Sequence, residues 1–376
     1  MTIECMNFEV SRKDLRSTRL HTATLDCPAG AVLCRIERFA LTANNITYGV
    51  FGDAMAYWQF FPADAEWGRI PVWGFAEVVE SKHEAIARGE RLYGYWPMST
   101  HVVLHPDRVT DAQFMDGVDY RRKLPTPYQV YTRLARDPLH DPQHEDHRAL
   151  LHPLFFTSWL AEDFLADNEF FGGTQVVLAS ASSKTALGVA FLLGNRGQTT
   201  ISQKNGGLSP ISRVGLTSPG NKAFCEQVGY YDQVVTYDAL TTLDAGVPTV
   251  FVDMAGDGKL LHAVHHHFKD QLKYSCIIGA THWENRQTQH QLPGPKPQFF
   301  FAPTQVQKRS KDWGYDGLVQ RLGRGWLAFL PSVKSWLEIR PSRGAEAVGA
   351  VYKEVLEGRQ PPRLGHVLSL VSSRGA

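Results

Sequence analysis

The sequence predicts an α/β protein in which a doubly wound parallel sheet is joined to a small β-barrel-like domain. Between residues 175 and 302, short apolar, β-branched runs alternate with segments of helical pattern, as in a parallel sheet covered by helices. Residues 1–104 instead contain short strands separated by turns, which is typical of a barrel. The chain of 376 residues is long enough for two such domains.

Composition narrows the function classes. A hydrophobic content of 43% and a charged content of 20% are typical of a soluble globular protein. The net charge of +1 argues against a nucleic-acid partner. The five cysteines contain no C-x-x-C pair, which favours a reducing cytoplasm and no zinc cluster. We find no signal peptide and no run of 18 apolar residues, so we expect a cytoplasmic protein without a membrane partner.

The barrel-like part is expected to begin with strands. Residues 31–39 alternate apolar and charged side chains, which predicts a half-buried antiparallel strand. Residues 40–53 are rich in turn formers and predict a loop with Tyr48 in its middle. The aromatic residues of 54–68 either line an apolar substrate pocket or anchor a long loop on the core. Further strands are expected within residues 70–80, 87–95 and 99–104.

Residues 105–150 are polar and contain prolines. Four histidines stand here among acidic residues: His140, His144, His147 and His152. They could bind a metal, but Pro138 and Pro142 prevent one continuous helix from aligning the imidazoles, so we favour a solvated connector. An apolar helix is expected over residues 146–166.

The stretch 173–190 predicts a buried strand, a small polar turn at 180–184 and a helix that starts at Thr185. Free N–H groups at a helix N-terminus and the helix dipole together favour an anion, so we expect a phosphate group here. The usual G-x-G-x-x-G pattern is absent, and small side chains with Lys184 replace it. A P-loop is disfavoured because Leu178 and Ser183 occupy its glycine positions. An ordinary strand-to-helix turn stays an alternative.

The rest of the sheet follows in order. Strands are expected at 213–217, 232–237, 249–256, 274–280 and 298–302, with helices after 218 and over 259–271. His265, His266 and His267 are consecutive in the second helix and point in different directions, so they cannot share one metal. The tail is expected to form a helix at 313–330, a strand at 336–340, a helix at 345–357 and a strand at 366–370.

Several local sequences resemble the medium-chain dehydrogenase/reductase superfamily. Residues 73–80 resemble its G-x-E-x-x-G-x-V-V strand, and 89–94 are similar to its G-D-R-V-x-G turn. Residues 251–256 and 277–280 look like its next two strand ends. More closely, the chain resembles the uncharacterised DUF2855 branch at residues 180–186, 215–218, 301–303, 308–309 and 313–314.

The resemblance implies a Rossmann-type nucleotide-binding domain over residues 151–330. A GroES-like β-barrel catalytic domain is implied over residues 1–150 and 331–376. It also implies a zinc-free member similar to the quinone oxidoreductases and enoyl reductases, because no Cys–His pair stands at plausible catalytic positions. Such proteins use NADPH to deliver hydride to an activated carbon-carbon double bond in an enone, enoyl thioester or quinone-like substrate. The cofactor carries the hard chemistry and the protein positions it.

The resemblance also implies site residues. Tyr48 is the candidate proton donor, and Asn44 is a candidate for binding the substrate carbonyl or the nicotinamide ribose. A structural Tyr48 is the alternative. The residues expected to bind NADP(H) are Ser180, Ala181, Ser182, Ser183, Lys184, Thr185, Thr217, Ser218, Asn221, Lys222, Asp253, Met254, Gly279, Ala280, Thr281, Phe301, Ala302 and Pro303.

The choice of NADP(H) over NAD rests on the end of the second strand. An acidic residue there would bind the ribose 2′-hydroxyl of NAD. This chain has Thr217, Ser218, Asn221 and Lys222, whose hydroxyl, amide and ammonium groups suit a 2′-phosphate. In similar NADPH-dependent proteins a lysine usually stands where Asn221 does, so either Asn221 or Lys222 could make the contact.

Other functions stay open on the sequence alone. A carbonyl or alcohol oxidoreductase could use Tyr48 to protonate an alkoxide, and a catalytically silent protein could bind NADP(H) without turnover. A magnesium-dependent ATP binder is disfavoured by the missing glycines. We expect a small substrate of apolar or planar character and a possible homodimer.

Overall fold

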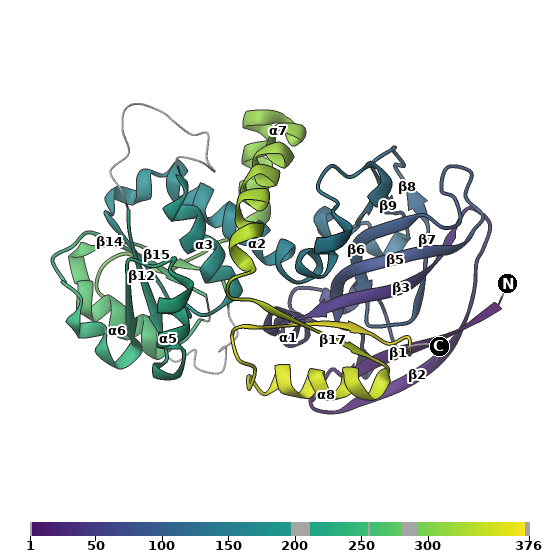
Figure 1. Ribbon diagram of the computed structural model, residues 1–376, viewed down its shortest axis with the longest axis horizontal. Coiled ribbons are helices and arrows are strands. Elements are labelled where there is room, and N and C mark those ends of the chain that lie inside the picture. Colours follow the sequence, from purple (N-terminus) through teal and green to yellow (C-terminus); the bar gives the residue numbers. More distant parts are fainter. Residues whose placement is uncertain (1, 197–210, 255, 280–291, 373–376) are drawn as a thin grey trace. The chain divides into compact units, whose positions relative to one another are not determined.

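The computed structural model describes residues 2–196, 211–254, 256–279 and 292–372 (Figure 1). Two compact units divide the chain, the first made of residues 1–153 and 338–376 and the second of residues 154–337. Their assignment as a catalytic and a nucleotide-binding domain stays a prediction, and each unit is described by itself below.

The first unit contains two β-sheets. Its strands are β1 Thr2–Ser11, β2 Thr18–Asp26, β3 Val32–Leu41, β4 Trp67–Gly68, β5 Pro71–Ser81, β6 Arg91–Pro97, β7 His101–Leu104, β8 Pro106–Asp107, β9 Gln113–Asp116, β10 Val130–Arg133, β17 Glu338–Arg343 and β18 Leu364–Ser369. The smaller sheet has the order β2-β1-β4, and the larger has the order β17-β18-β3-β5-β6-β10-β9-β8, with β7 also paired to β3. Two helices, α1 Ala43–Val50 and α8 Ala345–Leu356, accompany them.

Strand β3 corrects one expectation. Its alternating sequence predicted one buried and one solvated face, yet most of its side chains are buried. Cys34 and Ile36 pack into the main core of the unit, whereas Leu33 packs into a second cluster with Cys27 and Ala31. The expected alternation holds at residues 34–37, where Cys34 and Ile36 are buried and the charged side chains between them are half-buried. The start of the strand differs, because apolar side chains there are buried on both faces.

Helix α1 is the second correction, because residues 40–53 were expected to form a loop. A capping box starts the helix: the Thr42 backbone N–H donates to Asn45 Oδ1 at 2.8 Å, and the Thr42 side chain accepts from the helix backbone. Such a box satisfies N–H groups that a helix start leaves open. Turn-forming residues were read as a loop, but two of them form a cap.

The aromatic segment after α1 is packed inward. Tyr57–Gln59 forms a 3-10 turn, and Trp58 is only 6% exposed. A Cβ on Gly52 would lie 2.1 Å from the Trp58 ring and one on Gly68 would lie 2.4 Å from it, so both positions need glycine. Phe60 is also buried. For these rings the structure favours the core-anchor alternative.

The histidines of the connector at residues 140–152 do not converge on one point. His140 Nε2 lies 2.9 Å from the Glu145 carboxylate, and His144 Nδ1 lies 2.7 Å from that of Asp141. Separate carboxylates thus hold two of the histidines. In the part of the chain that the structure describes, no three His, Cys, Asp or Glu side chains are grouped to hold a metal ion.

The second unit contains one parallel sheet. Its strands are β11 Gln175–Leu178, β12 Ser212–Thr217, β13 Gln233–Thr236, β14 Thr249–Asp253, β15 Leu272–Ile277 and β16 Gln298–Phe299. They lie in the order β13-β12-β11-β14-β15-β16, and every adjacent pair is parallel. From β11 the chain adds β12 and β13 on one side and then β14, β15 and β16 on the other side. The expected doubly wound sheet is therefore confirmed.

Helices accompany this sheet (Figure 1). They are α2 Glu145–Asp167, which begins before the division at residue 153, α3 Lys184–Gly194, α5 Pro219–Val228, α6 Gly258–Phe268 and α7 Ala302–Val333. Helix α7 starts earlier than the expected residue 313 because Pro303 is tolerated in a first helical turn, and it is interrupted at Gly314, where φ is 72°. None of the described helices is long and apolar enough to cross a membrane.

Candidate functional site

The expected phosphate-binding turn lies at the carboxyl end of β11. All four residues of this strand are buried, and α3 begins at Lys184. Ser183 caps the helix, because its Oγ accepts a hydrogen bond from the Ala186 N–H at 3.2 Å. Ser180 has a φ of 50°, in the left-handed region that glycine adopts at little cost. A serine here carries a strain that the missing glycine would avoid.

Neighbouring segments fix the backbone of this turn. The Ala181 N–H donates to the Leu216 carbonyl at 2.9 Å, and the Tyr231 hydroxyl donates to the Ala181 carbonyl at 2.7 Å. A Cβ on Gly215 would lie 2.9 Å from that of Ala181, so a larger residue would push the turn away from β12. The turn is therefore held from both sides before any ligand binds.

Lys184 is the first residue of α3 and is half-buried. Loss of hydration lowers the pKa of its ammonium group to about 8. A negative group placed beside it would raise this pKa again. The next residue, Thr185, belongs to the same helical turn, and its carbonyl accepts from Ser158 Oγ at 2.8 Å.

A side chain of α5, the helix that follows β12, also contacts this turn. Asn221 Nδ2 donates to Ser182 Oγ at 3.0 Å. Lys222 instead forms an ion pair with Glu226 one helical turn further along α5. Of the two residues that could contact a 2′-phosphate, the structure brings Asn221 to the turn and places Lys222 in a surface pair.

Thr217 and Ser218 stand immediately before α5. Thr217 is 1% exposed and ends β12. It hydrogen-bonds the thiol of Cys225, whose pKa is raised to about 11 by burial. Ser218 is the N-cap residue of α5 and is half-buried. The Thr217 side chain is thus committed to the core, which leaves Ser218 nearer to solvent.

The ends of β14 and β15 approach each other closely. Asp253 is fully buried and its Oδ1 accepts from the Gly256 N–H at 2.9 Å, while its carbonyl accepts from the Ile278 N–H at 2.8 Å. A Cβ on Gly279 would lie 2.1 Å from the Met254 carbonyl oxygen. Asp253 therefore ends its strand as a structural carboxylate, and Gly279 permits a backbone crossing.

The remaining expected cofactor residues follow β16 or lie outside the described residues. Phe301 is 49% exposed and is the N-cap residue of α7, with Ala302 and Pro303 in the first turn. Ala280 and Thr281 lie outside the described residues. Because β11, β12, β14 and β15 are parallel, the expected residues that follow these strands share one edge of the sheet.

Tyr48 and Asn44 lie on α1 in the first unit. Asn44 Nδ2 donates to the Tyr48 hydroxyl oxygen at 2.8 Å. Tyr48 is 6% exposed, and burial raises the pKa of its phenol well above the ordinary value, with Tyr128 adding to the effect. The phenol is therefore protonated at neutral pH, and its oxygen is held in place by Asn44.

Sequence reasoning missed the aromatic surroundings of Tyr48. Its ring centroid lies 4.5 Å from that of Tyr57 and 5.9 Å from that of Tyr95, and the Trp73 ring lies 5.1 Å from Tyr95 in a tilted arrangement. Trp73 and Tyr95 are direct partners in the β5–β6 register. Rings at residues 73, 93 and 95 on two adjacent predicted strands were the signal that could have found this cluster.

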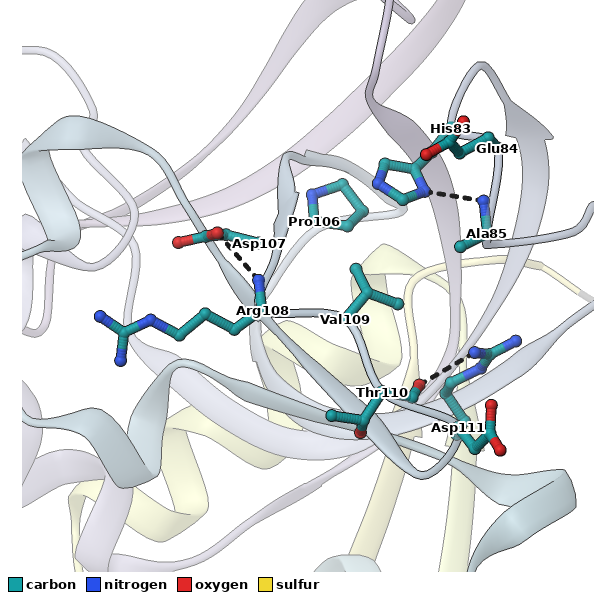
Figure 2. Close-up of a pocket in the computed structure, with 10 residues that line it drawn as sticks. His83, Glu84, Ala85, Pro106, Asp107, Arg108, Val109, Thr110 and Asp111 are labelled. Carbon is teal, nitrogen blue, oxygen red and sulfur yellow. Dashed lines mark hydrogen bonds between the residues drawn. The ribbon is translucent and has the colours of Figure 1, made fainter.

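A separate open pocket of about 580 Å³ lies in the first unit. It is lined by the loops at residues 83–85 and 106–111 and by Arg133. Figure 2 shows that its polar groups are partly satisfied from within: the Ala85 N–H donates to His83 Nδ1 at 3.1 Å, and Arg133 Nη1 donates to the Thr110 carbonyl at 3.0 Å. Among the residues that the structure describes, none of those expected from the sequence to form the site lines it.

Comparison with known proteins connects this geometry to a family and a fold. The family model described as "Protein of unknown function (DUF2855)" matches residues 39–361. A sequence comparison with curated proteins finds no match.

Three solved structures share the fold over nearly their whole length. A putative NADPH:quinone reductase from Mesorhizobium loti is 13% identical with a TM-score of 0.63, covering 98% of this chain and 99% of that one. CurA from Vibrio vulnificus in complex with NADPH is 15% identical with a TM-score of 0.59, covering 96% and 98%. The yhdH oxidoreductase from Salmonella enterica in complex with NADP is 11% identical with a TM-score of 0.53, covering 98% and 99%. The expected Rossmann-type sheet with a GroES-like barrel is confirmed.

Proposed function

The chain belongs to the DUF2855 family, and we propose that it is an NADP(H)-dependent reductase that transfers hydride to an activated carbon-carbon double bond. One observation carries the proposal: an all-parallel sheet presents a backbone-fixed polar turn at the end of its central strand. Proteins crystallised with NADPH or NADP share this fold along almost the whole chain. The substrate class is the finer part of the proposal.

The turn suits a diphosphate. The first-turn N–H groups of a helix have no intrahelical partner and favour an anion, and in α3 Ser183 caps the N–H of Ala186. Lys184 begins this helix, and loss of hydration lowers its pKa to about 8. A nearby anion would therefore stabilise the charged form of its ammonium group. Serine side chains occupy space that glycine would leave open, so contacts to the turn would include hydroxyl groups as well as backbone.

The end of β12 would distinguish NADPH from NADH. Between Thr217 and Cys225 the described residues include no acidic side chain that would repel a 2′-phosphate. The next acidic residue, Glu226, forms an ion pair with Lys222. Asn221 already reaches the turn through Ser182, and its N–H donates to the Ser218 carbonyl at 3.0 Å. We therefore assign Asn221 and Ser218, rather than Lys222, as the main 2′-phosphate contacts.

When bound, the nicotinamide supplies the hydride. The residues of this chain then provide the proton. Tyr48 is protonated at neutral pH, and Asn44 donates to its oxygen at 2.8 Å, so the phenol O–H, which interacts with Tyr128 in this structure, would donate to an enolate instead. The enolate takes up this proton, and the resulting phenolate recovers one from solvent.

A titration with NADPH and with NADH, followed by quenching of tryptophan fluorescence, tests the cofactor assignment. We expect micromolar binding with a preference for NADPH. A preference for NADH would contradict the role of Asn221 and Ser218, and no binding of either would contradict the function. Transfer of deuteride from labelled NADPH across enones, enoyl thioesters and quinones then tests turnover, and product mass and NMR separate a saturated ketone from an alcohol, the product of a carbonyl reductase.

A catalytically silent NADP(H)-binding protein is the second candidate. The 6% exposure of Tyr48 favours it, because a buried phenol has little access to a substrate. Tight NADPH binding without deuteride transfer to any substrate of the panel would support this candidate over the reductase.

A further inference from the structure

Two histidines of α6 form an exposed pair that the proposed hydride chemistry does not use. His262 and His266 are both exposed, and their ring centroids lie 3.8 Å apart with 23° between the ring planes. Residues four apart on a helix project from the same side, so both imidazoles face solvent together. The stack brings the two imidazoles together at one place on the surface, and rotation of the exposed His262 side chain would bring one nitrogen of each ring to a single ion.

The other two histidines of α6 have different tasks. His265 is fully buried, with Nδ1 2.9 Å from the Pro293 carbonyl and Nε2 3.0 Å from Ser275 Oγ. His267 Nε2 lies 2.9 Å from the Leu243 carbonyl. These two rings bind neighbouring segments of the second unit. The consecutive residues 265–267 cannot share an ion, whereas the pair one helical turn apart can.

A hydrogen bond selects the tautomer of His266. Its Nδ1 lies 2.8 Å from the His262 carbonyl oxygen. A carbonyl only accepts, so Nδ1 carries the proton and Nε2 of the neutral ring has a free lone pair. Metal-ligating histidines show the same arrangement, in which the second ring nitrogen donates to a carbonyl and orients the ligand.

The electrostatics of α6 are mixed. His266 lies in the last turn of the helix, where the macrodipole presents partial negative charge and favours a cation. Lys259 and Lys269 are each three residues from one of the two histidines and oppose a cation. The balance argues for a modest surface site and against a buried structural ion.

We propose that His262 and His266 chelate one divalent first-row transition ion, with water in the remaining positions. Imidazole nitrogen suits Cu²⁺, Ni²⁺ and Zn²⁺, whereas Mg²⁺ and Ca²⁺ prefer oxygen ligands. Affinity follows the order in which Cu²⁺ exceeds Ni²⁺ and Zn²⁺. The site is separate from the proposed reductase site and does not depend on it.

Calorimetric titration of the full-length protein with Cu²⁺, and then with Zn²⁺, tests the proposal. Wild type, H262A, H266A and the double variant are compared, with H21A as a control that removes one partly exposed imidazole from β2. We expect each single variant to lose at least about tenfold in affinity, the double variant to lose no more than either, and H21A to match wild type. This non-additivity is the signature of one shared ion.

Two results would overturn the proposal. One is wild-type affinity in the double variant, and the other is losses that are small and add across the two single variants. Circular dichroism of the metal-free variants establishes that they are folded, which both exposed positions favour. In wild type, histidine ¹⁵N spectra with Zn²⁺ should report ligation at Nε2 of His266; ligation at its Nδ1 would contradict the tautomer argument.

Discussion

The turn after β11 and the surroundings of Tyr48 are built in opposite ways. The turn is formed by one continuous stretch, strand then turn then helix, and is fixed mainly by backbone hydrogen bonds. Tyr48 contacts rings from three separated segments, those of Tyr57, Tyr95 and Tyr128. A local, backbone-built site tolerates changed side chains, which fits the alanine and serine residues that stand in place of the usual glycines. A site assembled from distant side chains depends on each of them.

The largest expected effect is on the proton donor. Tyr48→Phe should lower kcat by about 10²- to 10⁴-fold, because general acid catalysis typically contributes this much. The affinity for NADPH should be unchanged, since α1 and the turn belong to different units. Steady-state kinetics and fluorescence titration measure the two quantities. Tyr57→Phe is the matched control, and an equal loss of kcat in both variants would remove the special role of Tyr48.

The next effect is on stability at a backbone crossing. Gly279→Ala should lower the free energy of unfolding by about 2–3 kcal/mol, because its Cβ would meet the Met254 carbonyl at 2.1 Å and backbone cannot move as a side chain does. Gly220→Ala is the control, since nothing lies within 4 Å of a Cβ there. Urea denaturation compares them, and equal midpoints would show that the crossing relaxes freely.

Lys184 gives an effect that depends on pH. Its pKa of about 8 rises when a phosphate binds, so binding takes up a proton as pH climbs above 8. NADPH affinity should be constant just below pH 8 and should fall between the pKa of free Lys184 and its higher pKa in the complex. The total fall is about tenfold for each unit that separates these two pKa values. Lys184→Gln should have lower affinity and lose this dependence. A flat profile in wild type would separate Lys184 from the cofactor.

The smallest effect is at the end of β12. Asn221→Ala should reduce the preference for NADPH over NADH about fivefold, which corresponds to one hydrogen bond of about 1 kcal/mol. Lys222→Ala should change it less than about twofold, since exposed ion pairs contribute little. Parallel titrations of both variants with both nucleotides measure the ratio. A larger loss for Lys222→Ala would reverse our assignment.

The same contrast explains how much the sequence could predict. The order of strands and helices from β11 to α6 was readable because each element has its own local pattern. The helix at α1 was missed because Thr42 and Asn45 look like turn formers until they act as a cap. The burial of Leu33 on β3 was missed because the second apolar cluster that covers it comes from other segments.

For the candidate site the limit is similar. Ser180 and its neighbours were predicted as a turn, but the contact between Asn221 and Ser182 joins residues 39 positions apart and has no local signature. The rings around Tyr48 come from strands and turns far apart in the sequence. Periodicity predicts which residues are buried and cannot by itself predict which buried side chains meet.

The pairing of β18 with β3 determines the order in which the protein can be completed during synthesis. His366 aligns with Leu41, so the edge of β3 at this point stays open until the ribosome has added the intervening residues, roughly 16–65 s at 5–20 residues per second. The second unit, residues 154–337, can close before that moment. An open strand edge invites pairing with other chains, so limited proteolysis of stalled nascent chains should find residues 39–41 protected only after β18 emerges.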